Sequence, residues 1–594
     1  MADAGTVRNR RKVPSPQANL ENKIKAKYTV QPRKNNGPFT PRSLFWIFLI
    51  TLTYTVITDP QFFIESFRRV LRGPKQWISV PGTTTHNDSQ VVLGADIAKR
   101  DAVVEAFKHA WLAYERDAMG ADEYHPISHE GTNLTEAGGI GYTVVDSIDT
   151  MLIMGLEDEY KRARSWIENS LTFERDGNFN TFETTIRVLG GLLSAYHLSD
   201  DSLFLDKAKD LADRMLPAFD TPSGLPYPMI NLAKRVGVFN EDSRKFVSTA
   251  EATTLQLEFR DLSHLLDEDI YWEKVEKVME VVKAARLHTG LASIFLNPED
   301  GHFVLSAIRL GSRGDSYYEY LLKQYIQTNL TEPVYRKMYD DAMEGVASHL
   351  IQRSQKAGLT YTSELIPERN PQGEISWRLV PKQDHLVCFF GGSLMLGAVH
   401  TGSLVHPVSI PPRASELTDQ GRRDWINGYE LIETCMKTHD TRTGLSPEIV
   451  HFRIPSDGID GSAAPDDWYI KGAKAGERPP YDARYILRPE TIESLFIAYR
   501  LTGNQRFRDY GWNIFQAIEK HCKIPTGGYA SVLSVDHVPV ENEDKMETFL
   551  MSETLKYLYL LFEDASVLPL SKWVFNTEAH PLPIFKPSIR TGFS

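Results

Sequence analysis

The sequence predicts an all-α fold in which helices are paired into hairpins. From about residue 92 onward, apolar residues recur at helical spacing in one segment after another, with no credible strand runs between them. Many helix pairs end in a glycine followed by an apolar residue, as in Ser223-Gly224-Leu225 and Thr443-Gly444-Leu445, which is a typical helix stop signal. Such turns recur roughly every 60 to 70 residues, which indicates repeated helical hairpins.

Fourteen helices are expected from these patterns, and they make seven hairpins. They lie near residues 100–118, 146–155, 159–170, 182–198, 203–217, 249–265, 271–285, 314–327, 332–353, 384–398, 422–438, 488–501, 505–520 and 547–562. An open solenoid and a closed ring both satisfy this number. Because the repeats diverge and carry no consensus like that of a binding array, one closed domain over residues 96–590 is the better interpretation.

The overall composition is that of an ordinary globular protein. Of the 594 residues, 42% are hydrophobic and 24% are charged, and the net charge is −12. Residues 1–42 hold ten Lys and Arg against Asp3 and Glu21, so the rest of the chain carries about −20 (−12 minus 8). An acidic body argues against nucleic-acid binding and is compatible with neutral ligands or cations.

The N-terminal region predicts a membrane anchor. Residues 1–43 are basic and rich in Pro and Asn, which is typical of a disordered tail. Residues 44–58 are uncharged and apolar, although they are shorter than the roughly 20 residues of a typical spanning helix. The basic region before them is too long for a cleaved signal peptide. We therefore expect a single-pass signal anchor over residues 44–58, followed by a stem over residues 59–95.

Other features set the orientation of this anchor, because the charges close to it are indecisive. Three glycosylation sequons, at Asn87, Asn133 and Asn329, all follow the apolar segment. The three cysteines of the chain suit a luminal domain with one disulfide and one buried thiol. We expect a cytosolic tail and a luminal body.

Carboxylates recur at the starts of alternate helices. In the segment 180–196, Glu183 stands one helical turn before Arg187, a pair that would by itself indicate a solvated surface contact. Comparable acids, usually followed by Ser or Thr, are Asp146, Glu251, Asp315, Asp384, Glu490 and Glu553. Acids favour helix N-termini for capping and dipole reasons alone. If the hairpins close into a ring, however, these acids meet around one axial cavity, which suits a cation, a polyol or both.

Two acids and a group of aromatic residues lie apart from this pattern. Glu448 follows a hairpin turn and Glu578 follows the last helix, and loops on a rigid scaffold commonly carry function. Aromatic side chains are candidates for apolar contacts with sugar rings, although most such residues belong to the core. These candidates are Phe259, Tyr317, Tyr318, Trp377 and Phe549.

Several long motifs resemble the class I α-1,2-mannosidases, glycoside hydrolase family 47. They are Val145-Asp146-Ser147-Ile148-Asp149-Thr150, Phe182-Glu183-Thr184-Thr185-Ile186-Arg187, Gly311-Ser312-Arg313-Gly314-Asp315-Ser316-Tyr317-Tyr318-Glu319-Tyr320, Leu445-Ser446-Pro447-Glu448, Arg488-Pro489-Glu490-Thr491-Ile492-Glu493-Ser494-Leu495 and Asn576-Thr577-Glu578-Ala579-His580-Pro581. The resemblance covers residues 95–590. It implies an (α/α)7 barrel and an inverting hydrolase that needs Ca²⁺.

The resemblance also implies roles for individual residues. Glu183 matches the general acid and Glu448 the general base, and Asp315 is a third catalytic carboxylate and a rival for one of these roles. Thr577, in a C-terminal segment that plugs the barrel, would bind Ca²⁺ through its hydroxyl and carbonyl oxygens, with waters held by nearby acids. Arg187 would orient Glu183 or contact the sugar. Further cavity acids that would bind sugar or calcium-bound water are Glu251, Glu319, Glu490, Glu493, Glu553 and Glu578.

Cysteines and one arginine complete the comparison with the family. Cys388 and Cys435 match the family's disulfide, which leaves Cys522 as a free thiol. Arg313 resembles the residue of the endoplasmic-reticulum members, where Golgi members carry an apolar residue. The resemblance implies that this arginine would hold the branches of the glycan by hydrogen bonds and restrict trimming largely to one mannose of the middle branch. Gly314 departs from the alanine expected at that position.

We therefore expect removal of terminal α-1,2-linked mannose from high-mannose N-glycans on glycoproteins, from Man9GlcNAc2 to Man8GlcNAc2, by a monomeric type II protein of the endoplasmic reticulum membrane. One alternative is a Golgi enzyme of broader specificity. The other is a related luminal factor that recognises mannose and hands misfolded proteins to degradation. The latter relatives tend to lack the cysteine pair, so the enzyme is the favoured hypothesis.

Overall fold

The structure is a computed structural model that describes residues 93–588 apart from 240–244, 288, 455–465 and 475. The predicted basic tail, the predicted anchor over residues 44–58, Asn87 and nearly all of the predicted stem lie outside these residues. In the described part of the chain, no helix has both the length and the apolar character needed to cross a bilayer.

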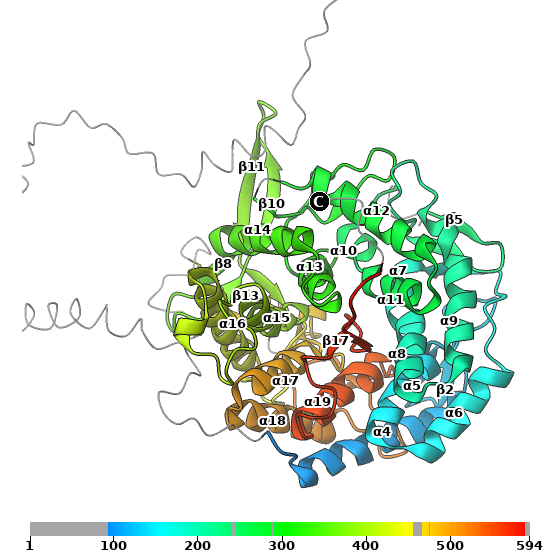
Figure 1. Cartoon of the computed structure of the whole chain (residues 1–594). Coiled ribbons are helices and arrows are strands. Elements are labelled where there is room, and N and C mark those ends of the chain that lie inside the picture. The colour runs from blue at the N-terminus through cyan, green and yellow to red at the C-terminus, as the bar shows by residue number, and fades with distance from the viewer. Residues whose placement is uncertain (1–92, 240–244, 288, 455–465, 475, 589–594) are drawn as a thin grey trace, which may run out of the picture.

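Two concentric rings of helices organise the described residues (Figure 1). The inner ring consists of α5 (Tyr142–Met154), α8 (Gly190–Ser199), α11 (Gln256–Leu266), α13 (Asp315–Gln327), α15 (Phe389–His400), α17 (Glu490–Thr502) and α19 (Leu555–Phe562). Each inner helix contacts the next, and the ring closes because the π-helical turn η7 (Leu550–Thr554), which leads into α19, contacts α5. The closed ring is therefore the correct choice over an open solenoid.

The outer helices pack against this inner ring. They are α4 (Ile97–Ala118), α6 (Glu157–Asn169), α9 (Ser202–Met215), α12 (Asp269–Ala285), α14 (Pro333–His349), α16 (Asp419–Thr438) and α18 (Gln505–His521). The inner helix α17 is buried along its whole length, whereas outer helices such as α18 bury one apolar face. All fourteen predicted helices are thus found within the described residues, and the predicted seven hairpins are confirmed.

Glycines bring two of these helices into backbone contact. A Cβ atom on Gly391 of α15 would lie 2.7 Å from the side chain of Ile432, and one on Gly428 of α16 would lie 2.6 Å from the carbonyl oxygen of Gly391. Any larger residue would force the helices apart. The glycine-rich sequence of α15 therefore reflects close helix packing.

The expectation that no strands interrupt the helices was wrong. Short antiparallel sheets form at the connections: β1 (Glu123–His125) with β2 (Glu130–Thr132); β3 (Asn178–Asn180), β4 (Met229–Asn231) and β5 (Val236–Val238); β6 (Val247–Ser248) with β7 (Phe295–Leu296); β8 (Ile351–Arg353) with β9 (Thr360–Thr362); β10 (Glu364–Arg369) with β11 (Ile375–Val380); β12 (Lys382–Asp384), β13 (Ile449–Phe452) and β14 (Trp468–Tyr469); and β15 (Ser531–Val532) with β16 (Asn542–Glu543). The strands are too short for alternation of apolar and polar residues to stand out in the sequence.

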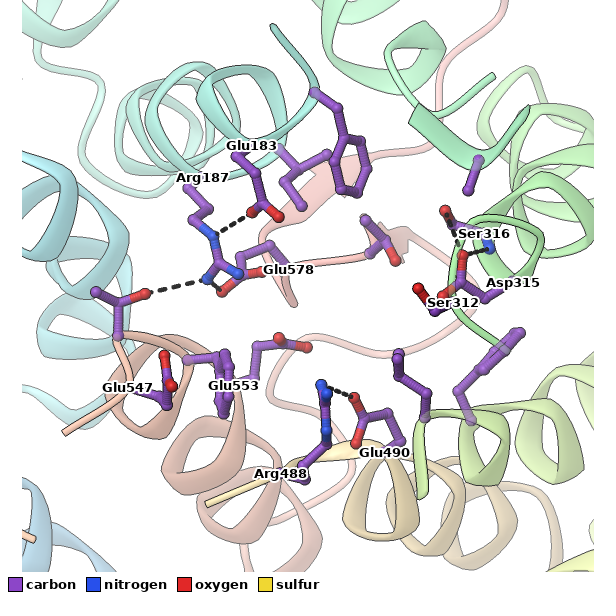
Figure 2. Close-up of a pocket in the computed structure, with 18 of the residues that line it drawn as sticks. Glu183, Arg187, Ser312, Asp315, Ser316, Arg488, Glu490, Glu547, Glu553 and Glu578 are labelled. Atoms are coloured by element: carbon purple, nitrogen blue, oxygen red, sulfur yellow. Dashed lines mark hydrogen bonds and ion pairs between the residues drawn. The ribbon is translucent and has the colours of Figure 1, made fainter. Parts of the chain in front are cut away.

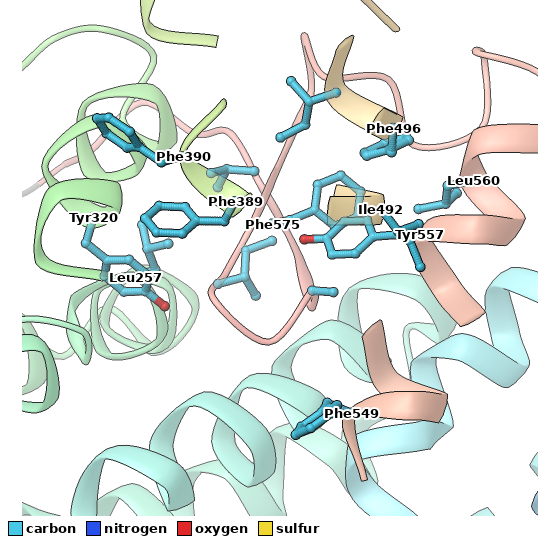
Figure 3. Close-up of a cluster of buried hydrophobic side chains, with 14 of the residues drawn as sticks. Leu257, Tyr320, Phe389, Phe390, Ile492, Phe496, Phe549, Tyr557, Leu560 and Phe575 are labelled. Carbon is cyan, nitrogen blue, oxygen red and sulfur yellow. The ribbon is translucent and has the colours of Figure 1, made fainter. Parts of the chain in front are cut away.

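A C-terminal hairpin enters the middle of the ring (Figure 1). Strand β17 (Trp573–Phe575) pairs with β18 (Pro581–Pro583), and these strands contact α13 and α8 respectively. Phe575 packs against Phe496 and Tyr557, with ring centroids 5.6 and 5.8 Å apart, in the apolar cluster that fills this part of the barrel (Figure 3). The tip of the hairpin, residues 576–580, is thereby held near the barrel axis.

The predicted disulfide is confirmed. Cys388, at the end of the 3₁₀ turn η4 (His385–Cys388), is bonded to Cys435 of α16, with the two Cα atoms 5.9 Å apart. Cys522 is a buried free thiol, as expected.

Removing this disulfide should destabilise the barrel. Because the bond closes a loop with a sequence separation of 47 residues, we expect the double variant Cys388→Ala/Cys435→Ala to lose about 4 kcal/mol of unfolding free energy. Denaturant titration of both proteins measures the loss. Cys522→Ala, which removes a buried sulfur without opening a loop, is the control, and a double variant no less stable than this control would contradict the prediction.

Candidate active site

A cavity of about 520 Å³ opens where the inner helices begin. Its wall carries most of the predicted site residues, which reach it from helices far apart in the sequence (Figure 2). The predicted residues that line it are Glu183, Arg187, Glu251, Arg313, Asp315, Glu319, Glu490, Glu493, Glu553, Thr577 and Glu578. Of the seven acids predicted at helix starts, Glu183, Glu251, Asp315, Glu490 and Glu553 meet around this cavity, whereas Asp146 and Asp384 do not line it.

Glu183 lies at the edge of this cavity and is held by its neighbours. Its backbone N–H donates to the side chain of Asn180, which caps the short helix α7 (Thr181–Glu183). Its Oε2 atom accepts hydrogen bonds from Arg187 Nε at 2.8 Å and from the hydroxyl of Tyr142 at 3.2 Å. Between α7 and α8 the chain forms a π-helix, η1 (Thr184–Leu189), an irregularity that often marks functional sites.

Arg187 connects several parts of the site. Besides Glu183, its guanidinium contacts Glu578 on the hairpin tip, the hydroxyl of Thr548 at 3.1 Å and a carboxylate oxygen of Asp146 at 3.4 Å. Figure 2 shows it between Glu183 and Glu578. The Glu183–Arg187 contact is therefore part of a buried network rather than a solvated surface pair.

Glu448 is the predicted site residue that does not line the cavity. Its buried carboxylate accepts hydrogen bonds from Arg488, with Nε 3.0 and 3.1 Å from its two oxygens and Nη2 2.5 Å from Oε1. Arg488 does line the cavity and also bonds Glu490 at 3.3 Å. Arg488 thus connects Glu448 to the wall of the cavity, a role that its place directly before Pro489-Glu490 did not reveal.

Asp315 begins α13 and faces the cavity. Its Oδ1 accepts a hydrogen bond from the backbone N–H of Ser316 at 2.9 Å. Burial, together with the charges of Glu319 and Asp384, raises the pKa of Asp315 to about 7, although the N–H of Ser316 and the charge of Arg488 oppose the rise. This carboxyl group can therefore hold a proton near neutral pH.

The structure gives a reason for the glycine that precedes Asp315. A Cβ atom on Gly314 would lie 2.4 Å from the carbonyl oxygen of Arg309. An alanine does not fit this backbone without displacing that residue. The departure from the family's usual alanine is therefore matched to the local conformation of this chain.

A second group of acids surrounds the hairpin tip. The hydroxyl of Thr577 donates to Glu319 at 2.9 Å, and the ammonium group of Lys323 contacts Glu319 and lies 3.6 Å from Glu493. Burial raises the pKa of Glu493 to about 8 and also raises the pKa values of Glu490, Glu553 and Glu578. Lys323 was missed from the sequence, because a lysine one turn after Glu319 resembles an ordinary helix-surface pair.

The oxygen atoms of this group fit a hard cation held largely through water. In the described part of the chain, no three His, Cys, Asp or Glu side chains are arranged to bind a metal directly. The Thr577 hydroxyl nevertheless faces a carboxylate, and one buried oxygen of Glu490 has no hydrogen-bond partner among the described residues. Such donors suit an ion that keeps several waters in its shell.

Arg313 stands at the mouth of the cavity. Its side chain is 46% exposed, lies 3.8 Å from Glu251, and covers the ring of Phe295 at 5.3 Å. Its backbone is left-handed, with φ of 73°, which is uncommon for a residue other than glycine. Burial raises the pKa of the neighbouring Glu251 to about 7.

The aromatic candidates and the sequons had mixed outcomes. Phe549 lines the cavity, whereas the other four aromatic candidates (Phe259, Tyr317, Tyr318 and Trp377) are buried in the core.

Asn133 and Asn329 are exposed, so both are accessible for glycosylation, which stays a prediction. Asp384, proposed for the ring of acids, is buried beside Lys382 and does not line the cavity.

Comparison with known proteins places this architecture and these residues in one family. Residues 106–584 match the model of glycosyl hydrolase family 47. The chain is 45% identical over 503 residues to a mannosyl-oligosaccharide 1,2-alpha-mannosidase of Candida albicans, which covers 83% of this chain and 85% of the relative. It is 41% identical over 545 residues to the endoplasmic reticulum mannosyl-oligosaccharide 1,2-alpha-mannosidase of Homo sapiens, covering 89% and 72%. Among solved structures, an alpha-1,2-mannosidase from Trichoderma reesei matches with a TM-score of 0.70 and 27% identity, covering 83% of this chain and all of that one.

The raised pKa of Asp315 predicts a pH-dependent effect on stability. Because the folded protein binds this proton more tightly than the unfolded chain, the group's stabilising effect is complete below its unfolded pKa and is lost as the pH rises toward about 7. Asp315→Asn should therefore melt at a higher temperature than the unmodified protein at pH 8 in chelator, and at nearly the same temperature at pH 4.

Asp117 provides a control, because its pKa is shifted in the opposite direction to that of Asp315. Hydrogen bonds from Arg116, His129 and Tyr124 lower its pKa, against a smaller opposing effect of burial. Asp117→Asn should accordingly reduce the melting temperature at pH 8. An Asp315→Asn variant that is destabilised at pH 8 would contradict the prediction for Asp315.

Proposed function

The chain belongs to glycosyl hydrolase family 47, and from this premise we propose that it is a calcium-dependent, inverting enzyme that removes one mannose from Man9GlcNAc2 to leave Man8GlcNAc2. That it is an α-1,2-mannosidase trimming N-glycans follows from the family and from its relatives. The observation that carries the proposal is the cavity in which the carboxylates of the inner helices surround Thr577 and Arg313.

Hydrolysis with inversion needs one group that protonates the departing oxygen and another that activates water on the opposite face of the sugar. Glu183 is our candidate for the proton donor and Glu448 for the base, as the family resemblance implies. Arg488 donates hydrogen bonds to both oxygens of Glu448 and so fixes the orientation of this carboxylate.

Asp315 is the rival proton donor. Its pKa of about 7 lets it carry a proton at neutral pH, as a general acid must. Glu183, in contrast, accepts a charge-assisted hydrogen bond from Arg187. Asp315 can therefore hold the proton that reaches the leaving oxygen, and the two assignments make different predictions for activated substrates.

Calcium is proposed to bind at Thr577. The hydroxyl and carbonyl oxygens of this residue would be direct ligands, and Glu319, Glu490, Glu493 and Glu553 would hold waters around the ion. The bound ion would supply positive charge and attachment points for two sugar hydroxyls. Support comes from the crowding of buried carboxylates whose pKa values are raised, because such a group gains most from a neighbouring cation.

Specificity for a single mannose is assigned to Arg313. Its partly exposed guanidinium at the mouth can donate hydrogen bonds to the branches of the glycan outside the cavity. The left-handed backbone at this residue indicates that its orientation is maintained at some cost, of order 1 kcal/mol. An apolar residue at this position would remove the donors and admit glycans in more than one orientation.

The site of action is proposed to be the lumen of the endoplasmic reticulum, with the chain anchored as a type II protein by residues 44–58. Relatives from human and two yeasts carry endoplasmic reticulum in their names. There the enzyme would act in glycoprotein maturation and quality control. A Golgi enzyme of broader specificity stays the nearer alternative, and the mannose-recognising degradation factor is disfavoured by the confirmed disulfide and by the names of the relatives.

Digestion of a Man9GlcNAc2 glycan tests this proposal. We expect the protein in calcium to give Man8GlcNAc2 as the main product by mass, and chelation to stop the reaction. Arg313→Leu should continue beyond Man8GlcNAc2, because the arginine donors that restrict the glycan are lost. Arg378→Leu, which changes an exposed arginine of β11, is the matched control. Rapid trimming by the unmodified protein to five mannoses would exclude the single-mannose specificity.

Two carboxylate variants distinguish the proton donors. Glu183→Gln and Asp315→Asn should each lose at least about a hundredfold in kcat on the natural glycan. With α-mannosyl fluoride, whose leaving group needs little protonation, the variant of the true donor should regain much of its relative activity, and the other variant should not. Most of the natural activity surviving in Glu183→Gln would remove that residue from the proton-donor role.

A further inference from the structure

A group of charged side chains lies beneath the cavity and has no part in the proposed chemistry. Asp146 and Asp149 project from α5, Lys556 from α19, and His580 from the end of the hairpin tip. All four side chains are fully buried. Burial of a charged group is costly unless it is paired and hydrogen-bonded, so their arrangement needs a specific explanation.

His580 bridges the two aspartates. Its Nδ1 atom lies 2.8 Å from Asp149 Oδ2, and its Nε2 atom lies 3.2 Å from Asp146 Oδ1. A neutral imidazole has only one N–H group, so one of its nitrogens would place a lone pair against a carboxylate oxygen. An imidazolium ion, with an N–H on each nitrogen, satisfies both contacts at once, and the pKa values of both aspartates are lowered, which keeps their carboxylates ionised. In agreement, although burial opposes the charge, the two aspartates raise the pKa of His580.

Lys556 pairs with one side of this bridge only. Its ammonium group donates to Asp149 Oδ2 at 2.8 Å and to the carbonyl oxygen of Ala579 at 2.9 Å. Among the described residues no hydrogen bond or ion pair joins Lys556 to Asp146, although the charge of Lys556 also acts on Asp146 electrostatically. Lys556 and His580 thus both balance the charge of Asp149, but only His580 also reaches Asp146.

Asp146 connects this bridge to the catalytic end of the cavity. Its other oxygen, Oδ2, accepts a hydrogen bond from Arg187 Nη1 at 3.4 Å, and Arg187 Nε donates to Glu183 at 2.8 Å. A continuous series of contacts therefore runs from His580 through Asp146 and Arg187 to Glu183. Arg187 also contacts Glu578, so the hairpin tip and Glu183 share one guanidinium group.

The hairpin tip needs such an attachment because its backbone is strained. Ala579 is buried and has φ of 59°, a left-handed conformation that costs a non-glycine residue about 1 kcal/mol or more. The side chain of Asn576 accepts hydrogen bonds from the backbone N–H groups of Glu578 and His580 at 2.9 and 2.8 Å. These contacts set the direction in which Thr577 and Glu578 face the cavity.

We infer that His580 is a positioning residue, which as an imidazolium ion between Asp146 and Asp149 fixes the hairpin tip and, through Asp146 and Arg187, the carboxylate of Glu183. It does not touch the substrate. The inference rests on the proposed mannosidase reaction, in which Glu183 is a catalytic carboxylate. Loss of the imidazolium should therefore slow the chemical step more than it weakens substrate binding.

The experiment compares three variants of the full chain on the Man9GlcNAc2 glycan, at a temperature where circular dichroism shows each to be folded. His580→Gln removes the bridge, and Asp146→Asn keeps the shape of the side chain but sets an amide N–H against one of its two donors. Both should reduce kcat at least about tenfold while KM changes less than about threefold, because small displacements of catalytic groups act mainly on the chemical step.

Lys556→Met is the matched control, since it removes one positive charge from the same buried group without breaking a hydrogen bond or ion pair to Asp146. It should reduce the melting temperature and keep kcat within about threefold of the unmodified protein. A loss of kcat in Lys556→Met as large as in His580→Gln, or an unchanged kcat in a folded His580→Gln or Asp146→Asn, would overturn the inference. If His580→Gln does not fold, the kcat of Asp146→Asn tests the inference instead. Failure of the unmodified protein to trim the glycan would instead contradict the proposed function.

Discussion

Negative charge concentrated on the barrel axis is the constraint on which the rest of this structure depends. Carboxylates from the inner helices and from the hairpin tip share one cavity, and burial raises the pKa values of several of them. Such a group is unfavourable unless cations or protons balance it. The chain supplies cations of its own for this purpose: Arg187, Arg488, Lys323, Lys556 and His580.

Arg187, Arg488, Lys323 and His580 each contact more than one acid, and these shared contacts fix the positions of the carboxylates. Arg488 holds both Glu448 and Glu490, and Lys323 contacts Glu319 and approaches Glu493. A carboxylate held by a shared cation cannot rotate freely, so its position is determined before any sugar enters. Catalysis benefits from such preorganised groups because little reorganisation is left for the reaction itself.

The closed ring explains how acids so distant in the sequence come together. Helices α13 and α17 each begin with an acid, Asp315 and Glu490, where the helix dipole favours negative charge. Because the inner helices run in the same sense around the ring, their N-terminal ends meet at one mouth. The C-terminal hairpin lies in the middle of the ring and adds Thr577 and Glu578 to the same cavity. Carboxylates at the N-termini of separate, ordinary helices thereby form a single site.

The sequence by itself determined the helical elements and the identity of most site residues. Periodicity located every inner and outer helix of the described residues, and motifs such as Phe182-Glu183-Thr184-Thr185 identified acids that do line the cavity. Tertiary structure alone decided which acids share a cation, since contacts such as Arg488 with Glu448 or His580 with Asp146 join segments far apart in the chain. It also decided that Lys323 is buried and that Glu448, bonded to Arg488, does not line the cavity. Local patterns specify the face and the ends of a helix, whereas burial and charge pairing arise only when the ring closes.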